Sequence, residues 1–167
     1  MAHLLIVEAN SRRAESMQWM LDFAMYEADF VPDGDSAIHY LKQNLLPDAL
    51  IANVVTPGVD GFHLCRKIRQ TPEFARLPVI LITEQDSAAG IENLVRRAGA
   101  AGLIERPLQR DQFLSEVDRA ILMSSVQDNP LAKASALEET AFLRDYNAWL
   151  SQMAHQAIHK LENVSAE

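Results

Sequence analysis

The chain has 167 residues and a mass of 18.7 kDa, which suits one domain with a modest extension and a core that needs no disulfide or metal. Its residues are 49% hydrophobic and 23% charged, as in ordinary globular proteins. The net charge of −8 argues against a broad nucleic-acid-binding surface, which needs basic residues. The single cysteine, Cys65, rules out an internal disulfide and fits a reducing compartment. Because no apolar run approaches the roughly 18 residues of a membrane span and the start of the chain lacks a signal-peptide layout, we expect a cytoplasmic protein.

Short apolar runs alternate with helical patterns along the chain up to residue 123. Strands are expected over residues 4–7, 28–31, 49–55, 78–83 and 102–106. Helices are expected over residues 11–25, with Ser11 as N-cap, and over residues 36–44, 62–71, 88–98 and 110–123. Five strands, nearly all apolar, alternate with five helices and predict a parallel sheet covered on both faces, a doubly wound α/β sandwich.

The functional site of such a fold lies at the carboxyl ends of the strands. The residues expected at those ends are Glu8, Asn53, Thr83 and Arg106. The function of the domain therefore depends on the chemistry of these four side chains.

Several segments together resemble the receiver domain of bacterial two-component response regulators. The segments that carry the resemblance are residues 5–8, 47–61, 78–83, 98–100 and 106–107. They fall within about residues 3–122 and occur in the order and spacing of that family. The resemblance implies a flavodoxin-like receiver fold with a five-stranded parallel sheet for residues 1–122. A linker and a C-terminal amphipathic helix are expected over residues 123–167.

In that family an aspartate accepts a phosphoryl group beside a Mg²⁺ ion that an acidic pair holds. At the acceptor position this chain has Asn53, whose amide is a poor nucleophile. Of the acidic pair Glu8 is kept, whereas Ala9 has no oxygen to offer a metal. Because Mg²⁺ prefers a shell of oxygens that includes carboxylates, the resemblance implies a degenerate acceptor pocket with no metal site, no cofactor and no catalysis.

Three further positions of the pocket follow the family to different degrees. Thr83 matches the switch hydroxyl, Leu103 stands at the position of the switch aromatic residue, and Arg106 stands where the family has a lysine. Arg106 has the reach to approach Glu8 and the amide oxygen of Asn53, and such contacts would lock one conformation without phosphate. The other interpretation is that these residues are tolerated replacements.

Residues 131–162 are expected to form one long helix, because this stretch contains no glycine or proline. Its apolar residues recur at spacings of three and four, at Leu143, Tyr146, Trp149, Leu150, Met153 and Ala157. This stripe must pack on a second copy of the chain, on its own receiver domain or on a partner, and we expect dimerisation first. The tail from residue 123 has three basic and six acidic residues, the wrong balance for DNA.

Three smaller features have a structural or an interface interpretation. Arg96 and Arg97 form a basic pair at the end of the fourth helix, on a surface through which receiver domains usually meet partners. His155 and His159 have the spacing of zinc ligands but lack a third ligand, so we expect both to face solvent. Cys65 is expected to be half-buried.

The sequence thus predicts a phosphorylation-independent pseudo-receiver in signal transduction, not an enzyme. It would act through contacts with signalling proteins and as a homodimer through its C-terminal helix, without nucleic acid or membrane. The residues expected to carry these contacts are Leu143, Tyr146, Trp149, Leu150, Met153, Arg96 and Arg97. Two alternatives stay open: a phospho-accepting response regulator of a two-component system with an unusual site, and a dimeric transcriptional regulator that binds DNA.

Overall fold

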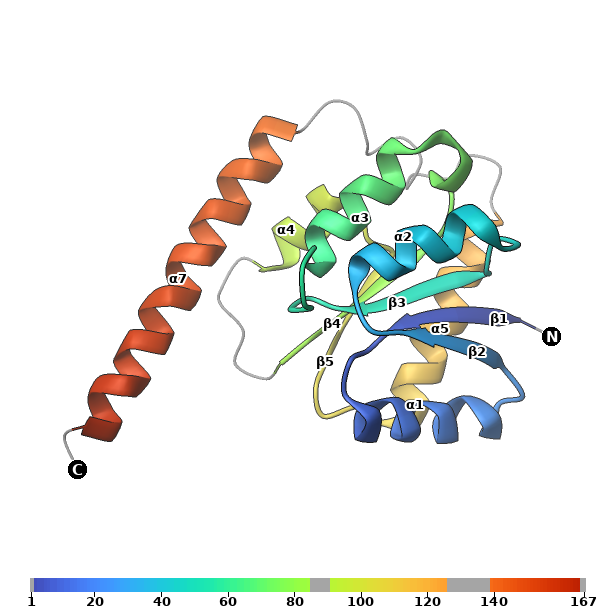
Figure 1. Ribbon diagram of the computed structural model, residues 1–167, viewed down its shortest axis with the longest axis horizontal. Helices are drawn as coiled ribbons and strands as arrows, with labels where there is room; N and C mark the ends of the chain where they lie inside the picture. The colour runs from blue at the N-terminus through green and yellow to red at the C-terminus, as the bar shows by residue number, and fades with distance from the viewer. Residues whose placement is uncertain (1, 85–90, 126–138, 166–167) are drawn as a thin grey trace.

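The computed structural model describes residues 2–84, 91–125 and 139–165 (Figure 1). The strands are β1 (His3–Val7), β2 (Glu27–Val31), β3 (Ala49–Asn53), β4 (Val79–Thr83) and β5 (Gly102–Glu105). The helices are α1 (Ser11–Phe23), α2 (Gly34–Gln43), α3 (Gly61–Gln70), the 3-10 helix η1 (Pro72–Phe74), α4 (Ile91–Ala98), α5 (Arg110–Ser124) and α7 (Glu139–Ser165). The expected alternation of strands and helices is confirmed.

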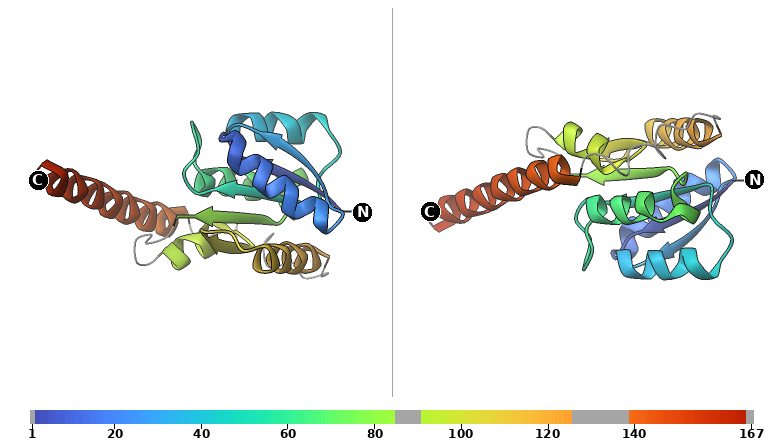
Figure 2. Two further views of the ribbon diagram at one scale, coloured as in Figure 1. Left: turned by 90° about the horizontal axis from the view of Figure 1, so that it is seen from below. Right: turned by 90° about the horizontal axis from the view of Figure 1, so that it is seen from above.

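The five strands are parallel and lie in the order β2-β1-β3-β4-β5. Helices α1 and α5 cover one face of the sheet, and α2, α3 and α4 cover the other (Figures 1 and 2). Leu5 and Leu50 pack into the layer of α2, α3 and α4, whereas Leu4 and Ile51 pack into the layer of α1 and α5, and all four are fully buried. Burying each such side chain contributes about 1.5–3 kcal/mol, so strands that are apolar on both sides produce the doubly wound sheet.

Side-chain caps set where the helices begin. The N-cap of α1 is Asn10, whose side chain accepts a hydrogen bond from the Arg13 amide at 3.1 Å. The expectation that Ser11 caps this helix is therefore wrong by one residue, since asparagine and serine are equally good caps. Asp33 caps α2 and Asp60 caps α3 in the same way.

Strand β3 ends at Asn53, two residues before the expected end. The Val54 amide still donates to the Ile82 carbonyl at 2.8 Å, but the chain then turns toward α3. A Cβ atom at Gly61 would lie 2.6 Å from the Asn53 carbonyl oxygen. Glycine at this position therefore lets α3 begin directly against the carboxyl end of β3, which fixes the backbone that carries Asn53.

Cys65 on α3 is fully buried, not half-buried as expected. Its neighbours Leu64 and Ile68 are also without exposed surface, because this face of α3 packs directly on the sheet. Burial raises the pKa of the Cys65 thiol to about 11. The thiol is therefore protonated at neutral pH and packs as a small apolar group.

The C-terminal helix α7 packs on α3 and α4, at the side of the receiver fold (Figure 1). Phe142 and Trp149 are 2% and 8% exposed, and Tyr146 and Met153 pack against the same core. Packing on the chain's own receiver domain, the second of the three expected arrangements, is the one present in the structure. Residues 131–138, expected to be helical, lie outside the described residues.

The expected apolar stripe of α7 is confirmed at Tyr146, Trp149 and Met153, which pack against the receiver core. It is wrong at Leu143, Leu150 and Ala157, which are exposed. Leu143 and Leu150 are 44% and 43% exposed, whereas Phe142, which the expected stripe left out, is buried. Apolar residues occupy two adjacent rows of this helix, and the fit to α3 and α4 decides which row is buried. Among the described helices, α7 included, none combines the length and the apolar character that crossing a bilayer requires.

Candidate functional site

Four expected side chains lie at the carboxyl edge of the sheet. Glu8 follows β1, Asn53 ends β3, Thr83 ends β4 and Arg106 follows β5. Glu8 and Thr83 are each 7% exposed. Because β1, β3, β4 and β5 are consecutive in the sheet, their ends form one polar site at this edge.

Arg106 joins Asn53 to Glu8. Its Nη2 donates a hydrogen bond to Asn53 Oδ1 at 2.7 Å and lies 3.5 Å from Glu8 Oε2. Asn53 Nδ2 donates to the same Glu8 carboxylate, and the Asn10 backbone amide donates to Glu8 Oε1 at 3.1 Å. The contacts expected for Arg106 are therefore present, and Glu8, Asn53 and Arg106 form a closed set of charge-assisted interactions, here called the triangle.

Arg106 also reaches outward to an acidic residue beyond β4. Its Nε lies 3.4 Å from Glu84 Oε1, and Nη2 of Arg13 on α1 approaches the same oxygen at 3.3 Å. The Arg106 side chain is 13% exposed, against 63% for Glu84. Burial and then the charge of Arg13 lower the pKa of Arg106, while Glu8 and Glu84 act to raise it. Because arginine stays protonated in proteins, the site holds a permanent positive charge.

The other expected pocket residues take no part in the interactions of the triangle. Ala9 is exposed and carries no polar side chain. Leu103 is half-buried and packs against the core beneath α2, α3 and α4. Thr83 lines a cavity together with Asn53 and Trp149, so it faces α7 at this edge of the sheet.

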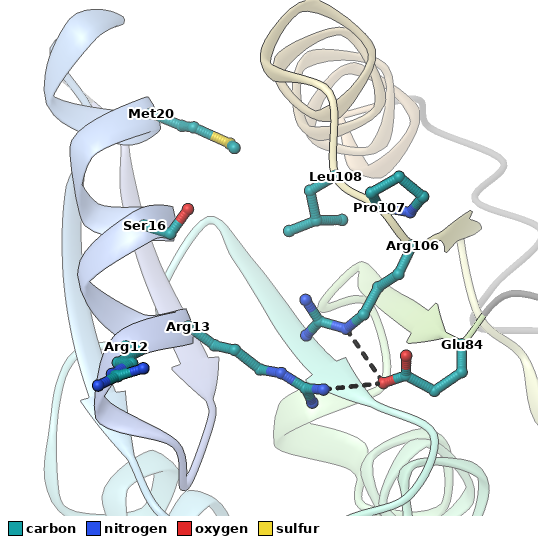
Figure 3. Close-up of a pocket in the computed structure, with 8 residues that line it drawn as sticks. All are labelled: Arg12, Arg13, Ser16, Met20, Glu84, Arg106, Pro107 and Leu108. Atoms are coloured by element: carbon teal, nitrogen blue, oxygen red, sulfur yellow. Dashed lines mark ion pairs between the residues drawn. The ribbon is translucent and has the colours of Figure 1, made fainter.

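Two cavities adjoin the triangle. The first, of about 520 Å³, lies between α1 and the segment that follows β5 (Figure 3). The second, of about 230 Å³, lies between the strand ends and α7, where Trp149, Met153 and Lys160 line it. Arg13 and Glu84 line both cavities, so the two are separated only by side chains.

Polar contacts fix α7 to the receiver domain. The Tyr146 hydroxyl donates to Asp60 Oδ2 at 2.5 Å, and the His63 ring meets the Tyr146 ring edge-on with centroids 4.4 Å apart. Arg97 Nε pairs with Asp145 Oδ2 at 2.6 Å. Burial, and next the bond to Asp60, raise the pKa of Tyr146 above its ordinary value. The contact between Asp60 and Tyr146 could not be predicted from the sequence, because only the fold brings these residues together.

Aromatic packing supplies the apolar part of this interface. The rings of Phe62 and Trp149 meet edge-on with centroids 5.2 Å apart, and Phe142 stacks on Tyr146 at 5.9 Å. Trp149 Nε1 is buried and has no hydrogen-bond partner among the described residues. Phe142 and Leu143 lie four and three residues before Tyr146, and both spacings fit the same helical face, so the sequence alone does not select Phe142.

The basic pair on α4 is divided between two roles. Arg97 contacts α7, whereas Arg96 is exposed and its Nη2 donates to Asn93 Oδ1 of the same helix at 2.8 Å. His155 and His159 are exposed on α7. Within the described ranges, no three histidine, cysteine or acidic side chains gather in a group that could hold a metal ion.

Comparisons with known proteins match residues 4–118 to the response regulator receiver domain. The response regulator MprA of Mycolicibacterium vanbaalenii is 28% identical over 138 residues, which cover 80% of this chain and 56% of MprA. The chain thus spans about half the length of the curated relatives it matches.

Solved structures show the same likeness. A response regulator from Chloroflexus aurantiacus is 31% identical with a TM-score of 0.68, over 72% of this chain and 98% of that one. The receiver domain of a sensor histidine kinase from Pseudomonas aeruginosa, with a magnesium ion in its active-site cleft, is 25% identical with a TM-score of 0.64, over 72% and 97%. Because the family match extends from β1 into α5, well over half of the sequence, this chain belongs to the family of response regulator receiver domains, which serve signal transduction.

Proposed function

We propose that this chain is a pseudo-receiver, which works in signal transduction without phosphorylation and through protein–protein contacts. The observation that carries the proposal is the position of Arg106, 2.7 Å from Asn53 Oδ1 and 3.5 Å from Glu8 Oε2. These two partners stand at the acceptor and metal-binding positions of the family. A permanent cation between them would hold the strand ends in one arrangement whether or not phosphate is present.

The side chains of the triangle do not supply the oxygen ligands that a Mg²⁺ ion requires. Mg²⁺ demands a near-octahedral shell of oxygens at about 2.0–2.1 Å, and Ala9 contributes none. Both oxygens of Glu8 already accept hydrogen bonds, from Asn10 and Asn53. A second cation beside Glu8 would meet the Arg106 guanidinium, and two unit charges at about 4 Å repel by roughly 4 kcal/mol at an effective dielectric of 20. We therefore propose that the protein uses no metal or other cofactor and catalyses no reaction.

The outward row of α7 is the surface we assign to partners. The row consists of Leu143, Leu150, Ile158 and Leu161, which are 44%, 43%, 54% and 69% exposed. Because the receiver domain occupies the face that carries Trp149, a second copy or a signalling protein would bind the outward row. Arg96, which is exposed on α4, is the other residue we assign to partners. The acidic tail argues against DNA as that partner, and a cytoplasmic location stays part of the proposal.

Beryllofluoride, a mimic of the phosphoryl group, tests the proposal in the presence of Mg²⁺. Trp149 is a suitable reporter because it lines the cavity shared with Asn53 and Thr83, and a Trp19→Phe background removes the signal of the other tryptophan, which is 65% exposed. We expect no saturable change in fluorescence, whereas a receiver domain with an intact magnesium site should bind the mimic. A saturable, Mg²⁺-dependent change in this chain would overturn the proposal.

Restoring the acceptor alone should not restore phosphorylation. In Asn53→Asp the new carboxylate would pair with Arg106, and Ala9 would still offer no oxygen to a metal. We therefore expect no incorporation of phosphate from acetyl phosphate, measured by intact-protein mass spectrometry. The matched variant combines Ala9→Asp, Asn53→Asp and Arg106→Lys, and it should gain phosphate. Incorporation by the single variant would contradict the assignment of the pocket.

A further inference from the structure

We propose that the cavity between α1 and the segment after β5 binds the oxyanion group of a small organic molecule. This cavity, here called the arginine groove, has a volume of about 520 Å³ and is lined by Arg12, Arg13, Ser16, Met20, Arg106 and Leu108 among others. Figure 3 shows Arg13 and Arg106 reaching into it from opposite walls, toward Glu84. The assignment goes beyond the pseudo-receiver proposal, which explains Arg106 but gives no role to Arg12 or Arg13.

The groove has more positive charge than its own residues neutralise. Three arginines line it, Glu84 is the one carboxylate among the described lining residues, and Glu8 of the triangle adds a single negative charge beside Arg106. Arg13 and Arg106 share a single oxygen of Glu84, at 3.3 and 3.4 Å, longer than the about 2.7–2.9 Å of a strong charge-assisted hydrogen bond. In a chain of net charge −8, this local excess of cations favours an anion from outside.

The position of Arg12 and Arg13 in the chain also favours a bound anion. Arg12 and Arg13 stand in the first turn of α1, which contains no acidic residue. The free N–H groups at a helix N-terminus carry partial positive charge, so cations there are unfavourable and anions are favourable. A bound oxyanion would remove this repulsion, since it would lie against the α1 wall of the groove.

Hydrogen-bond donors remain for such a ligand. The ion pairs and hydrogen bonds of Arg106 use Nη2 and Nε, and the ion pair of Arg13 uses Nη2, whereas each guanidinium has five N–H donors. Two guanidinium forks that face one space can each bind an oxyanion through two oxygens. The Ser16 hydroxyl lies on the same wall as Arg13 (Figure 3).

The remaining lining residues indicate the chemical character of the rest of the ligand. Met20 lies farther along α1, opposite Pro107 and Leu108 across the groove (Figure 3). These apolar side chains and the volume of the groove fit a molecule with an apolar group beside its anionic one. A phosphate ester and a carboxylate share this chemistry, and the choice between them is made by the probes.

Isothermal titration of the full chain with phenyl phosphate tests the proposal, after passage of protein and buffer over a chelating resin so that no metal takes part. We expect saturable binding of one phenyl phosphate per chain, tighter than that of inorganic phosphate because the ring meets Met20 and Leu108, and no binding of phenol. Benzoate that binds more tightly than phenyl phosphate would identify the carboxylate as the preferred oxyanion. Absence of saturable binding by every oxyanion at millimolar concentration, or binding that requires Mg²⁺, would overturn the proposal.

Matched substitutions locate the binding site. Arg13→Gln should weaken binding of phenyl phosphate by about tenfold or more, the loss of one hydrogen bond between charged groups, and Arg12→Gln should weaken it less. Arg144→Gln removes the same charge from an exposed position of α7 and should leave binding unchanged. Equal affinities of the Arg13 and Arg144 variants would refute the site. Because neither variant touches the triangle, this result is separate from the beryllofluoride experiment.

Discussion

Replacing Arg106 by alanine tests whether the triangle stabilises the protein. The substitution removes the 2.7 Å bond to Asn53 and the ion pair with Glu8, whose side chain is 3% exposed. A hydrogen bond to a charged group contributes about 1.5–3 kcal/mol, and removing one partner of a buried ion pair costs about 3–5 kcal/mol. Because Asn10 and Asn53 still bond to Glu8 in the variant, we expect the free energy of unfolding to fall by about 2–4 kcal/mol.

Urea unfolding followed by circular dichroism measures this loss. With a slope of about 1–3 kcal/mol per molar urea, the midpoint should fall by roughly 1–2 M and the slope should stay unchanged. A double-mutant cycle with Asn53→Ala should give a coupling energy of about 1 kcal/mol or more. Arg144→Ala is the control, since an exposed position away from special contacts changes stability by less than about 0.5 kcal/mol.

The refuting result is a variant that behaves like the control. If Arg106→Ala lost no more than about 0.5 kcal/mol and the cycle gave no coupling, Arg106 would be a tolerated replacement. The cation could then not hold the strand ends in one arrangement, and the pseudo-receiver proposal would lose the observation that carries it.

Two further predictions concern α7. Trp149→Ala should release α7 from the receiver domain, because truncating a buried tryptophan costs about 3–5 kcal/mol. Limited proteolysis should then cleave α7 faster. Leu150→Ala, in the exposed row, is the control and should leave the rate of cleavage unchanged. Burial and the bond to Asp60 raise the pKa of Tyr146. The contribution of the Tyr146 hydroxyl to the packing of α7 on the receiver domain is therefore complete below the ordinary tyrosine pKa of about 10 and is lost as the pH rises above that value. Docking followed through Trp149 fluorescence should therefore weaken in alkali, and an unchanged profile in Tyr146→Phe would contradict this origin.

The local pattern of apolar residues was enough to predict the sheet, because it identifies strands that are buried on both sides. The residues of β1 and β4 are apolar on both sides, and only a position between two helical layers buries both sides at once. The ends of the helices and strands were predicted less accurately than their order. Whether Asn10 or Ser11 caps α1 depends on which of these two adjacent polar side chains turns back to the helix. The end of β3 was predicted two residues too late. The chain turns toward Gly61 because α3 approaches β3 closely, and this approach is a tertiary contact that local pattern does not contain.

The rotation of α7 could not be predicted from spacing. Phe142 and Leu143 are neighbours in sequence and begin two apolar rows on adjacent faces, and each row satisfies a helical period. Only the surface of α3 and α4, with Phe62 placed to meet Trp149, selects the row that begins with Phe142. The arginine groove has the same origin, since Arg13 and Arg106 are far apart in sequence and meet only across the carboxyl edge of the sheet.

If Arg106 stands in for the metal ion, as the pseudo-receiver proposal holds, the way in which a signal enters this fold would change. A metal ion and a phosphoryl group can leave, whereas Arg106 cannot, and contacts of about 2–4 kcal/mol favour one arrangement of the strand ends by a factor of roughly 30 to 900. Only a ligand with a comparable preference for another arrangement can reverse that bias. The arginine groove is placed to receive such a ligand, because Arg13 and Glu84 also line the cavity beneath α7, beside Trp149. An oxyanion that draws Arg13 away from Glu84 would therefore change the wall of the cavity beside Trp149, and binding, in place of phosphoryl transfer, would be the input.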